Sequence, residues 1–187
     1  LIFLIIGYPA FIAIFAHLDP FKFAKKITRV AVFGFSTSSS AATLPLNVKT
    51  TVEELGVDEK IASFVLPLGM TINMNGTAIM QVIATLFIAG CAGYSISFTQ
   101  LVVIALLALI ASAGTPAAPG SGAIILFTIL SGLGYVNDAA MLAYSLILAI
   151  NRPIEMLVTA LNVVGDSATS IYVAKSEGVL NEDVYNA

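Results

Sequence analysis

Between two strongly apolar runs, the chain reads SAGTPAAPGSG over residues 112–122. Two prolines and three glycines in this stretch prevent a continuous helix. The apolar runs on either side, 98–111 and 123–133, are suited to lipid. Because lipid cannot hydrogen-bond a free N–H or C=O group, irregular backbone at membrane depth survives only where protein, ligand, ion or water bonds it. The stretch therefore predicts the tip of a helical hairpin at a functional site.

The composition places the whole chain in a membrane. Hydrophobic residues make up 58% of the 187 residues, charged residues make up 10%, and the mean hydropathy is +0.98. No Asp, Glu, Lys, Arg or His occurs from Ile61 to Asn137, and one helical crossing takes about 20 apolar residues. We expect an all-α polytopic membrane protein in contact with the lipid bilayer. The net charge of −3 leaves no basic footprint for nucleic acid.

Two further interruptions make the architecture repetitive. A Ser/Thr/Ala run, Ser36 to Pro45, follows an amphipathic segment, and Thr71 to Thr77 interrupts the next apolar run. Paired interruptions in corresponding segments point to the binding site of a transporter. We therefore predict an inverted repeat of a re-entrant hairpin plus a broken transmembrane helix, all in one transport domain. The expected segments are a truncated transmembrane helix (1–18), re-entrant hairpin 1 (19–56), a broken transmembrane helix (57–92), re-entrant hairpin 2 (93–135), a long transmembrane helix (136–176) and a polar tail (177–187).

The last predicted helix carries a polar stripe. Its members are four, four, three and four residues apart, within about 80° of the helix surface; they are Asn151, Glu155, Thr159, Asn162 and Asp166. Burying each acid in a membrane should cost about 2.5 to 3.5 kcal/mol, so each needs a partner. Carboxylate and carbonyl oxygens suit a hard cation, and we expect Na⁺, with further ligands from freed carbonyls at Gly69, Asn73 or Asn162. The alternative is that the stripe only bonds neighbouring helices, or that Glu155 pairs with Arg152.

The hairpin tips offer the opposite polarity. A helix that begins near Ser40 or Gly120 directs free N–H groups and the positive end of its dipole into the site. We expect an anionic group, such as a substrate carboxylate, to bind there.

These motifs resemble the dicarboxylate/amino acid:cation symporter family. The resemblance covers almost the whole chain in order: SSAATLP (39–45), LPLG (66–69) followed by NMNGT (73–77), the second hairpin (111–122) and NVVGD (162–166). It implies one sodium site from the carbonyls of Gly69, Asn73 and Asn162 with the Asp166 carboxylate. It implies a second from the carbonyls of Thr71, Ser112, Ala113 and Thr115. The substrate site that it implies consists of Ser39, Ser40, Thr77, Ala118, Gly122, Glu155, Val158, Thr159 and Asn162, with the second hairpin as the gate.

The chain departs from the family pattern at three places. Members for acidic substrates carry an Arg where this chain has Val158, or alternatively at Ser38. Asn75 stands where the family has the Asp of a further sodium site, and Glu155 stands where an Asp receives the substrate ammonium. The departures predict a sodium-coupled symporter for a small neutral amino acid. The alternative within the family is another carboxylate or a sulfur-containing amino acid.

The resemblance also implies the wider assembly. We expect a multi-pass protein of the cell membrane, an elevator-type movement, and a homotrimer formed through a scaffold that this chain does not contain. A truncated product without transport of its own is a further possibility. An intramembrane hydrolase is the rival from another class, but His17 is far from every tip serine in the sequence, and Glu155 and Asp166 share one helix. We therefore predict that the chain is not an enzyme.

Overall fold

The computed structural model describes residues 1–187 as an all-helical chain without strands, which confirms the predicted helical class. The first helical segment runs without a break through η1 (Phe3–Gly7), α1 (Tyr8–Phe11) and η2 (Ile12–Ala16). The remaining helices are α2 (Pro20–Thr37), α3 (Ser40–Glu53), α4 (Glu59–Ile72), α5 (Asn75–Cys91), α6 (Phe98–Ala113), α7 (Ser121–Gly132), α8 (Asp138–Ser176) and α9 (Glu182–Asn186).

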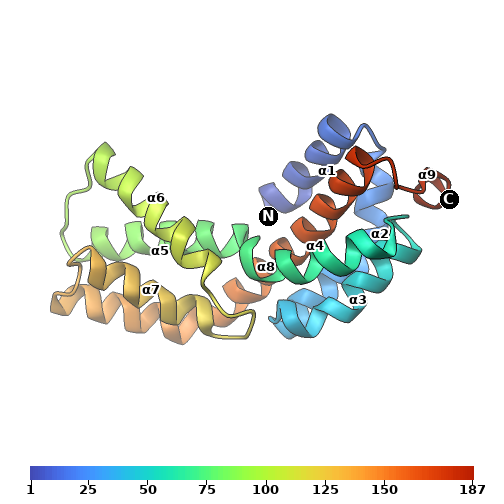
Figure 1. Ribbon diagram of the computed structural model, residues 1–187. Helices are drawn as coiled ribbons and strands as arrows, with labels where there is room; N and C mark the ends of the chain where they lie inside the picture. Colours follow the sequence, from blue (N-terminus) through green and yellow to red (C-terminus); the bar gives the residue numbers. More distant parts are fainter.

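The helices form two lobes that share α8 (Figure 1). One apolar core gathers side chains from the first segment, α2, α4, the second half of α8 and α9. The other gathers side chains from α5, α6, α7 and the first half of α8. With 39 residues, α8 is about 58 Å long and reaches through both lobes. The junction between the lobes is therefore crossed by one unbroken helix.

Each lobe contains a helical hairpin. Hairpin 1 consists of α2 and α3, and its chain reverses over Ser38, which has φ +51°, and Ser39. The Ser39 hydroxyl caps α3 by accepting a hydrogen bond from Ala42 N at 3.2 Å. Hairpin 2 consists of α6 and α7, joined by residues 114–120, and Gly120 at φ +87° precedes α7. The two turns lie within the interruptions seen in the sequence.

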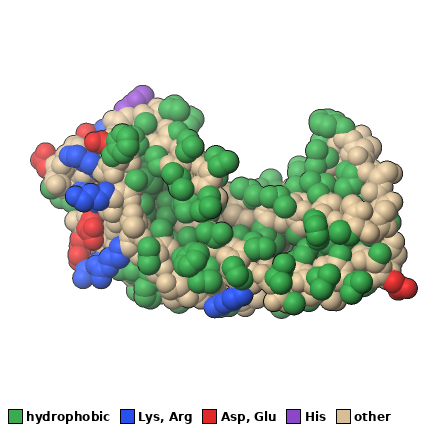
Figure 2. Space-filling view, turned by 180° about the vertical axis from the view of Figure 1, so that it is seen from behind, with side chains coloured by type: hydrophobic (Ala, Val, Ile, Leu, Met, Phe, Trp, Pro, Cys, Tyr) green, Lys and Arg blue, Asp and Glu red, His purple; other side chains and the backbone are tan.

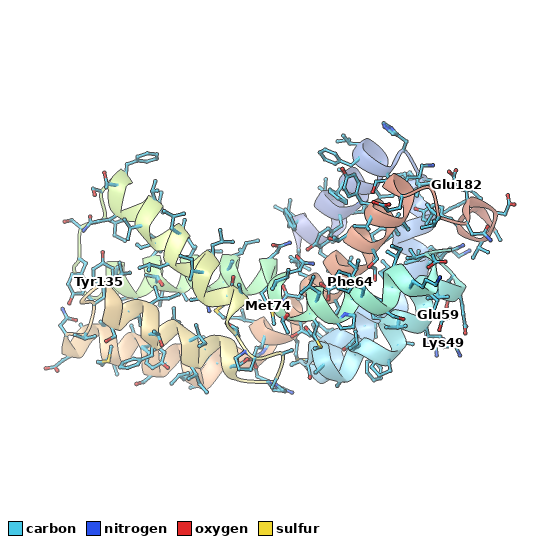
Figure 3. The ribbon with its side chains drawn as sticks, viewed as in Figure 1. Lys49, Glu59, Phe64, Met74, Tyr135 and Glu182 are labelled. Atoms are coloured by element: carbon cyan, nitrogen blue, oxygen red, sulfur yellow. The ribbon has the colours of Figure 1, made fainter.

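The third interruption separates α4 from α5. Asn73 and Met74 have non-helical dihedral angles, φ −89° with ψ 68° and φ −103° with ψ 46°. The break lies at the junction of the lobes, where Met74 is labelled in Figure 3. In contrast, α8 passes the same junction without a break. No helix break therefore frees the carbonyl of Asn162, and the side-chain amide of Asn162 bonds Gly76 N and Thr77 Oγ1.

Much of the surface is apolar. Figure 2 shows hydrophobic side chains over most of the visible face, with most of the charged side chains gathered at one end. Two helical stretches, Glu59–Cys91 and Asp138–Ser176, are long and apolar enough to cross a membrane, and three shorter helices are also apolar. These features agree with the membrane protein predicted from the composition.

The end of the chain is not simply a polar tail. Residues 177–187 contain α9, and the side chain of Tyr185 in that helix is completely buried. A five-residue helix has too few turns for its periodicity to show in the sequence, so the sequence predicts only a polar tail there.

Candidate functional site

The tips of the two hairpins meet beside α8. The Ser39 hydroxyl donates a hydrogen bond of 2.9 Å to the carbonyl of Ala117, and Ala41 N donates one of 3.4 Å to the same oxygen. From the second tip, Gly120 N donates a bond of 2.6 Å to Oε1 of Glu155 on α8. The two hairpin tips, which are far apart in the sequence, therefore meet beside Glu155 on α8.

A small cavity lies beneath the tips. Its volume is about 30 Å³, which is about the room of one water molecule. Of the nine substrate residues predicted from the sequence, eight line it: Ser40, Thr77, Ala118, Gly122, Glu155, Val158, Thr159 and Asn162. Ser39, the ninth, contacts hairpin 2 instead. The lining contains one acid and no Lys, Arg or His.

Asn162 joins the cavity to the break between α4 and α5. Its Oδ1 accepts a hydrogen bond of 2.8 Å from Gly76 N, and its Nδ2 donates one of 3.2 Å to Thr77 Oγ1. The start of α5 lies directly on α8, because a Cβ at Gly76 would come within 2.8 Å of the Val158 carbonyl. The break and the cavity are therefore joined through the side chain of Asn162.

A second cluster surrounds Asp166, which is 2% exposed. Asn73 Nδ2 donates a hydrogen bond of 2.9 Å to Asp166 Oδ1. The carboxylate lies against α4, because a Cβ at Gly69 would come within 2.6 Å of the same oxygen. Gly69, Asn73 and Asp166 also line one groove of about 710 Å³ between α4 and α8. We name Gly69, Asn73 and Asp166 the acid corner.

The acid corner extends through Asn75 to Tyr8. Asn75 Nδ2 donates to Asn73 Oδ1 at 2.7 Å and to the Tyr8 hydroxyl at 3.2 Å. The motifs in the sequence do not predict Tyr8 as a site residue. Its signal was present, since Tyr8 is the only residue with a side-chain hydroxyl in the first 16 residues.

The residues predicted for the second sodium ion lie at the ends of α4 and α6, which contact each other. Thr71 lies near the end of α4, while Ser112 and Ala113 end α6. The carbonyl of Ser112 accepts a hydrogen bond from Thr115 N at 3.0 Å. Thr115 also lines the cavity beneath the tips.

Two contacts of Glu155 refine the expectations from the sequence. The N–H groups of the tips were expected to be free, but Gly120 N bonds Glu155 and Ala41 N bonds Ala117. Such groups need acceptors inside a membrane, and here the protein provides them. Glu155 Oε2 also pairs with Arg152 Nη1 at 3.6 Å, so the pairing considered as an alternative does form. Arg152 remains half exposed.

Comparison with known proteins gives a consistent result. The family profile described as "Sodium:dicarboxylate symporter family" matches residues 1–176. An excitatory amino acid transporter of Caenorhabditis elegans is 35% identical over 164 residues, which cover 87% of this chain and 32% of the relative. Excitatory amino acid transporter 2 of Homo sapiens is 36% identical over 162 residues, which cover 85% of this chain and 28% of the relative. The chain thus spans about a third of the length of the curated relatives that it matches.

Proposed function

Because the chain belongs to the sodium:dicarboxylate symporter family, we propose that it forms the transport domain of a sodium-coupled symporter for a small neutral amino acid. The observation that carries the substrate class is the lining of the cavity beneath the tips. It offers Glu155 to an ammonium group, and Val158 in place of a cationic side chain. A second negative charge on the substrate would have no counter-ion inside the cavity.

The substrate contacts follow from the chemistry of the lining. The ammonium group of the substrate would pair with Glu155. The carboxylate of the substrate would accept hydrogen bonds from N–H groups at the hairpin tips. Gly120 N and Ala41 N now bond protein acceptors, and the cavity has only about 30 Å³. Binding therefore requires the tips to separate and exchange these bonds for bonds to the substrate.

The proposed sodium site is the acid corner. It holds the buried carboxylate of Asp166, to which Asn73 Nδ2 now donates; this carboxylate and the carbonyls of Gly69 and Asn73 would supply the oxygen ligands that suit a hard cation. Its Asn73 lies within five residues of Gly76, which donates a hydrogen bond to Asn162, and of Thr77, which lines the cavity. A cation that repositions Asn73 would also reposition these two residues, and this is the proposed physical basis of coupling.

The further sodium residues and the assembly are proposals of the same kind. We assign a second ion to the carbonyls of Thr71, Ser112, Ala113 and Thr115. Asn75, which stands where the family has an Asp, would supply no carboxylate to a further sodium site. The domain would move as an elevator against a scaffold outside this chain, within a homotrimer of the cell membrane.

A second candidate is a symporter for an acidic amino acid or another dicarboxylate. The relatives at 35% and 36% identity are named excitatory amino acid transporters. One structural observation favours it, since Arg152 lies 3.6 Å from Glu155. If a substrate ammonium displaced Arg152, the freed guanidinium would be available to a second carboxylate.

Uptake into proteoliposomes tests both candidates. The transporter that contains this chain is supplied with labelled Ser, Ala, Thr, Asp, cystine or succinate, with and without an inward sodium gradient. We expect sodium-driven uptake of Ser or Ala, and transport of Asp with Ser and Ala ignored would reject the neutral substrate. Asp166→Asn should abolish the sodium dependence, whereas Asp138→Asn, at the exposed start of α8, should not.

A further inference from the structure

The C-terminal segment docks against the base of hairpin 1. Tyr185 of α9 is completely buried and belongs to the apolar core of that lobe. Its hydroxyl donates a hydrogen bond of 2.8 Å to the carbonyl of Asp19, the residue that caps α2. Burial, with a contribution from Asp19, raises the pKa of the Tyr185 phenol. The last helix is therefore tied to the start of hairpin 1.

Lys26 joins the docked segment to both legs of the hairpin. Its Nζ lies on α2 and donates to the carbonyls of Val184 and Tyr185 at 2.8 Å each. It also donates to the carbonyl of Glu54, just after α3, at 2.9 Å. All three donors of the ammonium group are thus used, and each goes to a carbonyl that no longer has a helical partner. The side chain of Lys26 therefore joins α2, the end of α3 and α9.

Contacts on either side complete the attachment. Asn181 N donates a hydrogen bond of 2.7 Å to the carbonyl of Gly56, in the turn between α3 and α4. Lys175, near the end of α8, pairs with Glu182, and Lys22 donates to the carbonyl of Asn186. The segment 181–186 therefore contacts α2, the turn after α3, and the end of α8.

A rotation at the base of hairpin 1 would produce a larger displacement at its tip. With 18 residues, α2 is about 27 Å long, so a rotation of about 5° at the base would move the tip by about 2 Å. A polar network holds the middle of the hairpin, where Asn47 Nδ2 donates to the Val163 carbonyl at 3.0 Å. The tip residues Ser38 and Ser40 line the cavity opposite α8.

We propose that residues 181–186 are a clasp, and that Lys26 and Tyr185 are positioning residues that hold the tip of hairpin 1 in the geometry needed to bind substrate. Without the clasp, the binding geometry is populated for only a fraction of the time, and the apparent substrate affinity falls by that fraction. The expected fall in substrate affinity rests on the proposed function. The consequence for the stability of the hairpin does not.

Hydrogen exchange of the full transporter in lipid nanodiscs tests the clasp. Tyr185→Ala and Lys26→Met should speed amide exchange in α2 and α3 by about tenfold or more, and leave α6 and α7 unchanged. Tyr185→Phe keeps the packing and should stay close to the unmodified protein. Lys25→Met is the matched control, because Lys25 is an exposed neighbour on the same helix. Tyr135→Ala is the second control, since Tyr135 stacks on Tyr94 at the base of hairpin 2 and is labelled at the far end of Figure 3.

The outcomes separate the clasp from the substrate. If hairpin 1 exchanges as before in both variants, or if exchange rises equally in both hairpins, the clasp is wrong. If Tyr185→Ala does not fold, Lys26→Met decides. If hairpin 1 loosens while the dissociation constant for L-serine is unchanged, the positioning role is wrong. If the unmodified protein does not bind L-serine, the proposed substrate fails, and the pattern of exchange still decides whether the clasp exists.

Discussion

Gly120 N donates a hydrogen bond of 2.6 Å to Oε1 of Glu155, and this bond joins the tip of hairpin 2 to α8. The acid that we propose for the substrate ammonium therefore also holds the closed tip. Its other oxygen pairs with Arg152. The closed tip and the proposed substrate site thus use the same carboxylate. A substitution that removes the charge of Glu155 and keeps its shape separates these two roles.

Glu155→Gln should leave the tip closed and weaken the binding of substrate. The amide oxygen still accepts from Gly120 N, but the charge for an ammonium group is lost. Truncating one partner of a buried charge pair costs roughly 2 to 5 kcal/mol, so substrate affinity should fall by about 100-fold. Titration calorimetry measures the dissociation constant, with Glu177→Gln at the exposed end of α8 as the control. An unchanged affinity would mean that Glu155 does not receive the substrate.

Gly69→Ala should weaken sodium binding. The added Cβ would lie 2.6 Å from Asp166 Oδ1, so α4 and the carboxylate must move apart. Overpacking of this kind typically costs about 1 to 3 kcal/mol, and we expect sodium affinity to fall by roughly tenfold or more. Gly90→Ala is the matched control, because a Cβ there has no atom within 4 Å. Equal sodium affinities in the two variants would argue against the acid corner.

Val158→Arg should change the substrate. Val158 lines the cavity beneath the tips, where a guanidinium could pair with a side-chain carboxylate. Sodium-driven uptake should shift from Ser to Asp, with a change of roughly tenfold or more in the ratio of their kcat/KM values. Val158→Met adds bulk without charge and should not favour Asp. If the arginine variant keeps the original preference, residue 158 does not set the substrate class.

A disulfide between the tips should stop transport reversibly. Ser39 Oγ lies 2.9 Å from the Ala117 carbonyl, so cysteines at these two positions are close enough for a bridge to be tested. In a Cys91→Ser background, Ser39→Cys with Ala117→Cys should lose substrate uptake on oxidation and regain it on reduction. Each single cysteine serves as a control. Full uptake in the oxidised, fully bridged protein would show that the tips need not separate.

Much of the site could be predicted from the sequence because its signals are local. The spacing of Glu155, Asn162 and Asp166 places all three on one face of a helix, and the Gly/Pro-rich tip marks where the backbone leaves the helix. The structure brings these features together around one cavity and one acid corner. The expected position inside the membrane is what makes these signals predict a site, because lipid offers no hydrogen-bond partners and the polar groups must bond one another, an ion or a ligand.

The rest depends on contacts between distant segments. Tyr8 reaches Asn75 across 67 positions, and Tyr185 reaches Asp19 across 166. A single tyrosine carries no periodic signal. The pair of Arg152 with Glu155 is different, because a separation of three residues on one helix brings the two side chains within reach, and the sequence therefore offers this pair as an alternative.

The most direct test of the account is linkage between sodium and substrate. The dissociation constant of L-serine is measured by calorimetry on the purified transporter that contains this chain, at low and at high sodium with ionic strength held constant by choline. We predict that sodium tightens L-serine binding by about tenfold or more, and that L-serine tightens sodium binding by the same factor, as linkage requires. Asp166→Asn should remove the effect. L-serine binding that does not change with sodium, or tight binding of L-aspartate instead, would contradict the account.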